Sequence, residues 1–248
     1  MDSTPAVAEI PRRAMVFAAG LGTRMGALTQ RTPKPLIHVG GRALLDYALE
    51  RFEQAGCERI VVNSHYLGEQ VQRHVEARRG PSELVLSPEP VLLETGGGVV
   101  QALPLLGEAP FYSANSDTIW LDHAGAVPAL TRLAAAFDRA RFDAMLMLHP
   151  LEHAVGYRGP GNFELSGDGA LSRAQAPRYV FTGVQLLSPS LFTGRPLAPF
   201  SLREIYRDAE RPDGSLARIG GLVHEGDWIH VGTPEELREA EAFLGHAR

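Results

Sequence analysis

The sequence predicts an α/β protein of the Rossmann-like kind, with a mostly parallel β-sheet flanked by helices. Short apolar runs typical of buried strands alternate with segments of helical periodicity, and a glycine-rich loop directly follows the first apolar run. Strands that alternate with helices are joined by crossover connections, which produce a parallel sheet. The 248 residues, 44% of them hydrophobic, suffice for the core of one large domain.

The first half of the chain repeats a strand–helix pattern. Its first strand is the run Met15-Val16-Phe17, and the glycine loop follows. The elements expected next are a helix over 43–55, a strand over 59–63, a helix over 66–77 and a strand over 83–87. The helix over 43–55 is expected to stop at Gly56, because glycine terminates helices.

The second half continues the alternation less regularly. Its expected elements are a strand over 111–114, a helix over 124–139, strands over 143–148 and 178–187, and a short helix over 202–207. Residues 149–171 hold five glycines and are predicted to form a lid or hairpin, and residues 217–227 a hairpin around Gly220-Gly221. Thr233, Pro234 and Glu236 form a capping box with proline at the first helical position, which predicts a helix over 234–244.

Composition excludes several classes of protein. The formal net charge of −5 argues against a general nucleic-acid binder. The absence of any run of 18 apolar residues argues against a membrane span, and residues 1–13 lack the pattern of a secretion signal. Cys57 is the only cysteine, which excludes an internal disulfide and a cysteine metal cluster. We therefore expect a cytoplasmic protein with a loose tail over 1–13 and a single domain over 14–248, while the oligomeric state stays open.

The loop after the first strand has the composition of a phosphate site. Gly20, Gly22 and Gly26 let the backbone approach a ligand closely and expose N–H groups to an anion, and Arg24 and Lys34 add positive charge. Ligands of such sheets gather at the carboxyl ends of the strands, where this loop lies. The spacing matches neither the dinucleotide fingerprint nor a Walker A loop. A plain glycine-rich turn remains the alternative, although the prolines on both sides of Lys34 restrict the backbone there.

These residues also carry a family resemblance. The segment FAAGLGTRM over 17–25, followed by TPKPL over 32–36, resembles the signature of the sugar-1-phosphate nucleotidylyltransferases. The resemblance implies a GT-A-like fold in which residues 14–122 mainly bind the nucleotide and 123–248 mainly the sugar. It also implies that Arg24 holds the phosphates of a nucleoside triphosphate, that Lys34 contacts the reacting phosphates, and that the loop wraps the triphosphate through Ala18, Ala19, Gly20, Gly22 and Thr23.

A second glycine motif, Leu93-Glu-Thr-Gly-Gly-Gly98, is predicted at the start of a helix. Three glycines there leave bare N–H groups and let a flat base or ribose lie against the backbone. A flexible turn is the alternative. This sequence motif resembles that of the uridylyltransferases that act on N-acetylmuramic acid 1-phosphate. The resemblance places Glu89, Gly96, Gly97 and Gly98 near the uridine.

The segment Asn115-Ser-Asp117 follows a strand and is a candidate cation site. Asp117 at that place suits Mg²⁺, although an aspartate that caps the next element is the alternative. The family usually has N-G-D here, with the aspartate on the metal and Asn115 among the substrate-binding residues; Ser116 replaces the glycine. The Thr182-Gly183 pair corresponds to a segment of the sugar pocket, and Gly183 either approaches the sugar or forms a bulge.

His230 departs from the family pattern. Most relatives have a second metal-binding aspartate in this W-x-D-x-G-T context. Here the second ligand would be an imidazole, which suits Mn²⁺ or Co²⁺ better than Mg²⁺. Alternatively, His230 packs under Trp228. Asp227 is a poor substitute, because residues 227 and 230 point to opposite faces of a strand.

The resemblance implies transfer of a uridylyl group from UTP to a sugar 1-phosphate, with pyrophosphate as the second product. N-acetylmuramic acid α-1-phosphate is the expected acceptor, in peptidoglycan recycling, and the expected partners are these small molecules, not nucleic acid or a membrane. Three alternatives stay open. They are the same chemistry on another pair, such as mannose 1-phosphate guanylyltransfer or glucose 1-phosphate uridylyl- or thymidylyltransfer, a non-catalytic nucleotide-sugar binder, and a glycosyltransferase, which usually needs a D-x-D motif.

Overall fold

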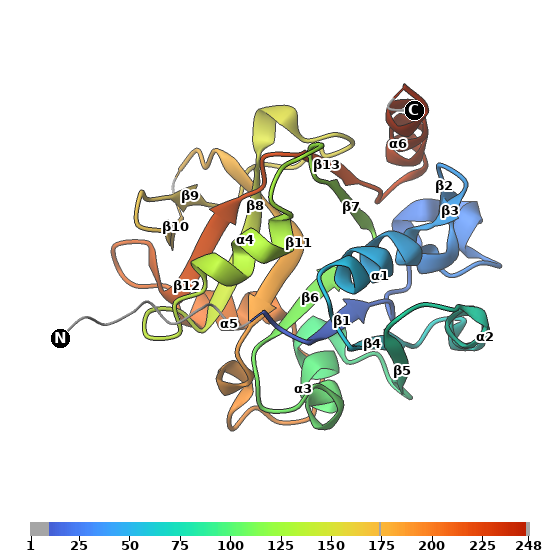
Figure 1. Ribbon diagram of the computed structural model, residues 1–248, viewed down its shortest axis with the longest axis horizontal. Helices are drawn as coiled ribbons and strands as arrows, with labels where there is room; N and C mark the ends of the chain where they lie inside the picture. Colours follow the sequence, from blue (N-terminus) through green and yellow to red (C-terminus); the bar gives the residue numbers. More distant parts are fainter. Residues whose placement is uncertain (1–9, 174, 247–248) are drawn as a thin grey trace.

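The computed structural model describes residues 10–173 and 175–246. In these residues the fold is built on a nine-stranded sheet in the order β5-β4-β1-β6-β11-β8-β12-β10-β9 (Figure 1). The strands are β1 (Arg13–Phe17), β4 (Arg59–Ser64), β5 (Glu83–Pro88), β6 (Phe111–Asn115), β8 (Ala144–Pro150), β9 (Glu164–Leu165), β10 (Ala170–Ser172), β11 (Tyr179–Leu187) and β12 (Ser215–Val223). All strands except β11 and β10 run in one direction. The predicted mostly parallel sheet is confirmed.

Helices cover both faces of the sheet. They are α1 (Leu44–Gln54), α2 (Gly68–Ala77), α3 (Glu94–Leu106), α4 (Ala129–Ala136), α5 (Leu202–Asp208) and α6 (Pro234–His246). Successive side chains of a strand point to opposite faces of the sheet, so the residues of β1 pack against the helices on both faces. Ala14 and Val16 pack in a core cluster with α1, α2 and α4, whereas Met15 and Phe17 pack in a second cluster with α3 and α5.

Two small antiparallel sheets complete the architecture. One pairs β2 (His38–Val39) with β3 (Arg42–Ala43), and the other pairs β7 (Thr118–Leu121) with β13 (Asp227–His230). Helix α6 lies beside β2 (Figure 1) and shares a third apolar cluster with both small sheets. This arrangement brings the end of the chain next to residues that follow the glycine loop.

Two predicted elements are wrong in extent or type. The helix expected over 124–139 is confined to α4, because Gly125 has a φ of 78° and Pro128 immediately precedes the helix. The hairpin expected over 217–227 is instead the continuous strand β12, which runs parallel to β8. Gly220 and Gly221 do not turn the chain; they let side chains from β8 and β10 pack against the strand, since a Cβ on Gly221 would lie 2.7 Å from a Leu171 methyl group.

The predicted loose tail is also too long. Residues 1–9 lie outside the described residues, but Arg13 already belongs to β1. The carbonyl of Arg12 accepts hydrogen bonds from the amides of Glu58 and Arg59, at 2.7 and 3.3 Å. The prediction of a tail is therefore wrong for residues 12–13. Across residues 10–173 and 175–246, no helix combines the length and apolar character needed to cross a bilayer.

Candidate active site

The glycine loop leaves β1 at the carboxyl edge of the sheet. It turns at Gly22, whose φ is 64°, into the 3₁₀ helix η1 (Thr23–Thr29). A Cβ on Gly22 would approach side-chain atoms of Lys34 and Thr29 at 3.0 Å, in addition to the strained backbone. The fully buried Met25 anchors the turn in the third apolar cluster, which leaves Arg24 exposed on its other side.

Buried polar contacts fix the start of this loop. The amide of Ala18 donates to Asn63 Oδ1 at 2.7 Å, and Asn63 Nδ2 donates to Glu89 Oε1 at the same distance. The second oxygen of Glu89 accepts from the amide of Leu93 at 2.9 Å. Glu89 is 4% exposed and thus ties the loop to β4 and to the start of α3.

Lys34 and Asp117 form an ion pair across the site, with 2.6 Å between Nζ and Oδ2. Lys34 belongs to the 3₁₀ helix η2 (Lys34–Leu36), which Pro33 precedes in an extended conformation. Burial alone would raise the pKa of the Asp117 carboxyl. The ammonium of Lys34, through its charge and its hydrogen bond, and the charge of Arg24 act in the opposite direction, and the pKa of Asp117 lies below its ordinary value, so the group is a carboxylate at neutral pH.

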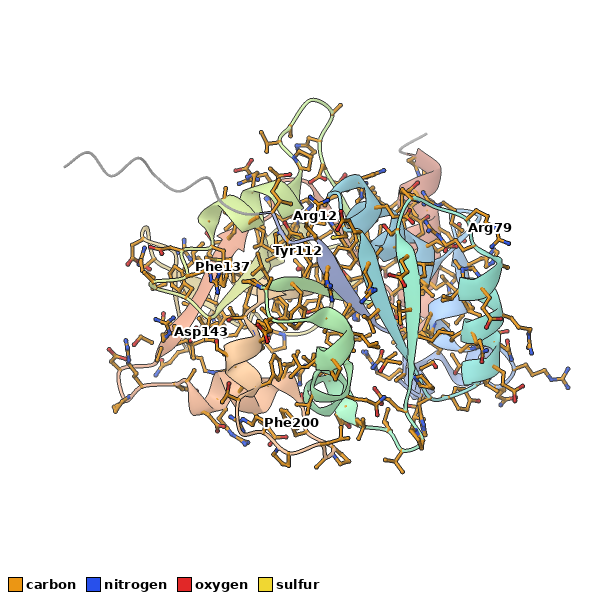
Figure 2. The ribbon with its side chains drawn as sticks, turned by 60° about the horizontal axis from the view of Figure 1, so that its bottom comes forward. Arg12, Arg79, Tyr112, Phe137, Asp143 and Phe200 are labelled. Atoms are coloured by element: carbon orange, nitrogen blue, oxygen red, sulfur yellow. The ribbon has the colours of Figure 1, made fainter. Side chains whose placement is uncertain are left out.

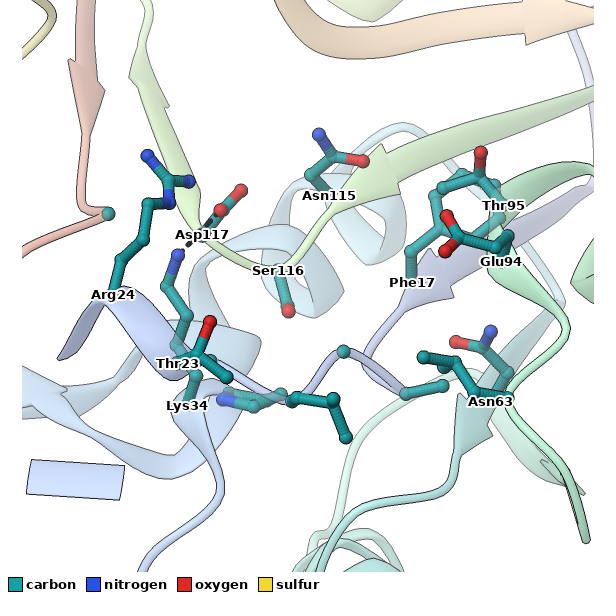
Figure 3. A pocket seen from close by; sticks show the side chains of 17 residues that line it. Phe17, Thr23, Arg24, Lys34, Asn63, Glu94, Thr95, Asn115, Ser116 and Asp117 are labelled. Atoms are coloured by element: carbon teal, nitrogen blue, oxygen red, sulfur yellow. Dashed lines mark hydrogen bonds and ion pairs between the residues drawn. The ribbon is translucent and has the colours of Figure 1, made fainter. Parts of the chain in front are cut away.

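A pocket of about 340 Å³ opens between the glycine loop and the start of α3. Figure 3 shows Lys34, Asp117 and Arg24 on one side of it and Glu94 and Thr95 on the other. Of the sequence-predicted site residues, the structure places in its wall Ala19, Gly20, Gly22, Thr23, Arg24, Lys34, Asn115 and Asp117. Ala18 and Glu89 are buried behind this wall and do not line it.

A second pocket, of about 550 Å³, continues from the first. The two pockets share the residues Arg24, Thr95, Asn115 and Asp117. The rest of the second pocket comes from residues 157–230, including Tyr157 and Asn162 from the segment predicted as a lid, Gly183 from β11 and Arg203 from α5. Two ligands placed in these pockets would therefore meet beside Asp117.

His230 lines the second pocket next to Asp117. The amide of Val231 donates to the Asp117 carbonyl at 3.0 Å. This bond brings His230, at the end of β13, next to Asp117, which lies in the turn between β6 and β7. The ring packs against Trp228 and Tyr157, with centroids 6.0 and 5.7 Å apart. Its Nδ1 lies 3.1 Å from Glu236 Oε2. The predicted packing of His230 near Trp228 is confirmed, and the ring also lines the second pocket, while metal binding by His230 stays a prediction.

The environment of His230 keeps its ring neutral. Burial lowers the pKa of the imidazole by more than the carboxylates of Asp117 and Glu236 raise it. Asp227 lines neither pocket, in agreement with the prediction that it points away from His230. The predicted capping box forms only in part: Thr233 Oγ1 accepts from the Glu236 amide at 3.3 Å, but the Glu236 carboxylate accepts from the Gly232 amide instead.

The bulge that was one of the two alternatives for Gly183 is confirmed, while its approach to a sugar stays a prediction. Its φ is 84°, and the register between β11 and β8 shifts between Phe181 and Gln185, so it forms a bulge. It also lines the second pocket, where a Cβ would approach the Asn115 amide nitrogen at 2.7 Å. The bulge therefore makes room for Asn115 beside the space where the two pockets meet.

The prediction of bare amides is wrong for Gly96 and Gly97. The amides of Gly96 and Gly97 donate to the carbonyl of Phe200, at 2.8 and 3.2 Å, and Phe200 lies near α3 (Figure 2). All three glycines are buried in the first turns of α3 and none lines either pocket. Their lack of side chains lets the 198–200 segment, Glu89 and Asn63 approach the helix.

Substituting Gly97 with alanine is expected to destabilise the fold by about 2 kcal/mol or more, because its Cβ would lie 2.2 Å from the backbone oxygen of Ala198. The matched control is Gly245→Ala in the exposed last turn of α6, where a Cβ meets nothing within 4 Å and a gain of about 0.5–1 kcal/mol is expected. Urea denaturation of both variants measures the two changes. Equal stability of Gly97→Ala and the parent chain would contradict the packing role.

The structure adds site residues that sequence reasoning missed. Glu94 and Thr95 line the first pocket, and Glu94 has a φ of 60°, which is rare outside glycine. Thr95 Oγ1 accepts from the amide of Leu202 at 2.9 Å, so it also positions α5. The signal for both was present, because they stand inside the L-E-T-G-G-G motif. Arg203 carried no comparable signal.

Comparison with known proteins agrees with this geometry. The MobA-like NTP transferase domain matches residues 14–198. The N-acetylmuramate alpha-1-phosphate uridylyltransferase of Caulobacter vibrioides is 42% identical over 97% of this chain and 100% of its own, and that of Neisseria meningitidis serogroup B is 34% identical over 94% and 98%. A UDP-glucose pyrophosphorylase solved with UDP-glucose shares the fold, with a TM-score of 0.76 at 17% identity over 96% of this chain and 99% of that one. The chain therefore belongs to the sugar-1-phosphate nucleotidylyltransferases with a MobA-like NTP transferase domain, as its glycine-loop motifs predict.

Proposed function

We propose that this enzyme transfers the uridylyl group of UTP to N-acetylmuramic acid α-1-phosphate, a reaction that would serve peptidoglycan recycling. The observation that carries the proposal is the pair of connected pockets that share Arg24, Thr95, Asn115 and Asp117. A nucleotide in the first pocket and a sugar phosphate in the second would place their phosphates beside the same charged groups. The names of the two full-length relatives supply the choice of base and sugar.

In the proposed reaction an oxygen of the sugar phosphate attacks the α-phosphorus of UTP in line, and pyrophosphate leaves. The attacking oxygen is already ionised, so the reaction needs no general base. Catalysis then consists of positioning and charge neutralisation. Arg24, exposed at the junction of the two pockets, would hold the triphosphate. The buried ammonium of Lys34 would stabilise the charge that develops at the reacting phosphates.

The residues beside Lys34 also fit a divalent cation. Asp117 is an ionised carboxylate, and the buried Nδ1 of His230 lies 3.1 Å from Glu236 Oε2 but has no hydrogen-bond partner among the described residues. Within the described residues no group of three histidine, cysteine, aspartate or glutamate side chains could hold a metal. A protein that offers one or two ligands suits Mg²⁺, which takes further oxygens from phosphates and water. When bound, such an ion neutralises phosphate charge and polarises the reacting phosphorus.

A panel of nucleoside triphosphates and sugar 1-phosphates tests the proposed function. Pyrophosphate release in the presence of Mg²⁺ is expected to be fastest for UTP with N-acetylmuramic acid α-1-phosphate. Faster release from GTP with mannose 1-phosphate, or from UTP or dTTP with glucose 1-phosphate, would assign the chain to another substrate pair. Tight ligand binding without product at any metal would identify a nucleotide-sugar binding protein instead.

His230→Ala tests whether the imidazole contributes to the cation site. Because a nitrogen ligand favours Mn²⁺ and Co²⁺ over Mg²⁺, the concentration of Mn²⁺ or Co²⁺ needed for half-maximal activity is expected to rise about 10-fold or more. The corresponding concentration of Mg²⁺ is expected to change much less. Metal titrations of both proteins at saturating substrates measure these values. Unchanged values for all three ions would leave His230 with only its packing role.

A further inference from the structure

We propose that Arg203 recognises a carboxylate on the sugar, so that the second pocket selects a sugar acid over the matching neutral sugar. The inference rests on the proposed function, because it names the feature of the acceptor sugar phosphate that this pocket reads. It concerns a residue for which the sequence motifs give no role.

Arg203 stands on a firmly held helix. Helix α5 buries Leu202, Ile205 and Tyr206 against the second apolar cluster, and a full capping box at Ser201 and Glu204 fixes its first turn. Arg203 and Tyr206, three residues apart, line the same pocket, and the Tyr206 ring contacts Phe181 edge to face at 6.4 Å. The guanidinium is thus presented from a rigid, partly aromatic wall, and less ordering is needed when it binds a ligand.

The charge balance of the second pocket leaves this guanidinium available. The charged or titratable side chains in its wall, tyrosines aside, are Arg24, Asp117, Arg173, Arg203 and His230. Asp117 is paired with Lys34, and Arg173 lies 3.0 Å from Glu210 Oε2 and over the ring of Phe163.

Arg24 also lines the first pocket, where the triphosphate is expected. Of the ion pairs among the described residues, none involves Arg203. Since it lines only the second pocket, it belongs to the part that the two pockets do not share.

The position matches the chemistry of a sugar acid phosphate. The phosphate of the acceptor must lie at the shared residues near Asp117 to react, which directs the rest of the sugar toward the wall that includes α5. N-acetylmuramic acid is a hexosamine with a lactyl ether, whose carboxylate is ionised at neutral pH. A planar guanidinium binds such a carboxylate through two parallel hydrogen bonds, which a neutral hydroxyl does not provide.

The test compares two acceptors that differ by the lactyl group, N-acetylmuramic acid 1-phosphate and N-acetylglucosamine 1-phosphate, with UTP as donor. Arg203→Gln is expected to lower kcat/KM for the acid about 10- to 100-fold, mainly through KM, the range for loss of one charge-assisted contact. It should change kcat/KM for the neutral sugar less than about threefold. The matched control is Arg207→Gln on the same helix, an exposed arginine outside both pockets, which should alter neither value.

The outcomes separate this inference from the proposed function. If the parent enzyme uridylylates neither sugar phosphate, the proposed function fails and the carboxylate site fails with it. If the parent enzyme is active but Arg203→Gln leaves the ratio of the two kcat/KM values unchanged, only the role of Arg203 is overturned. Equal losses on both acceptors would show that Arg203 acts on the phosphate or the fold instead. A lowered ratio with an unchanged urea midpoint supports the inference.

Discussion

Lys34→Ala is expected to lower the turnover number of nucleotidyl transfer by about 100-fold or more, the usual loss when one preorganised charge contact is removed from a phosphoryl-transfer site. The Lys34 ammonium is buried beside Asp117 and lines the first pocket, and because Lys34 is the only lysine of the chain, no other lysine can replace it. Pyrophosphate release under saturating UTP, sugar phosphate and Mg²⁺ measures the change.

The control for this substitution is Arg31→Ala. Arg31 is an exposed cation on the same loop that lines neither pocket, so its removal should leave turnover within about twofold of the parent value. Lys34→Met keeps the apolar stem of the side chain and separates loss of charge from loss of packing. Turnover that survives in both Lys34 variants would remove this residue from the mechanism.

Asp117→Asn is expected to lower turnover further, by about 1000-fold, while the protein stays folded. The amide keeps the shape of the carboxylate but removes the negative charge that faces the pocket and Lys34. A cation site with one carboxylate depends strongly on it, and loss of the charge stabilisation that a cation provides costs several kcal/mol, or roughly three powers of ten. Turnover should not recover when the Mg²⁺ concentration is raised 10-fold.

Asp227→Asn provides the comparison for Asp117→Asn. Asp227 begins β13, the strand that ends at His230, but it lines neither pocket. Its substitution should therefore leave turnover within about twofold of the parent value. A large loss in Asp227→Asn together with a small loss in Asp117→Asn would reverse the assignment of the carboxylate.

The sheet could be predicted from sequence because its strands are short apolar runs with clear boundaries. The observed bounds of β1, β4 and β5 and of α1 and α2 lie within about two residues of the predicted bounds at most ends. The prediction failed at glycines whose role is to let distant segments of the chain pack closely together. Gly220 and Gly221 look like a turn in the sequence, but they lie in a strand against Phe142, Met145 and Leu171, and these contacts exist only in the folded protein.

The candidate site likewise contains residues that sequence motifs identify and residues that only the folded structure identifies. Arg24, Lys34 and Asp117 stand in compact motifs, and the structure brings these three together. Gly96 and Gly97 belong to an equally distinctive motif, yet their amides donate to the carbonyl of Phe200 and they line neither of the two pockets. Arg203 lies in an ordinary amphipathic helix, and only the packing of α5 on the sheet directs it to the second pocket.

The contact of Glu236 with Gly232 and His230 has a consequence for synthesis of the protein. Glu236 stands in the first turn of α6, whereas Arg24 and Lys34 are made at the beginning. A ribosome therefore delivers the glycine loop early, whereas α6, the helix that packs against η1 of that loop, is made after all the other described elements. A nascent chain that ended before α6 would lack Ala240 and Leu244, which share the third apolar cluster with Met25, so we expect the glycine loop to be fully packed only after α6 has been made.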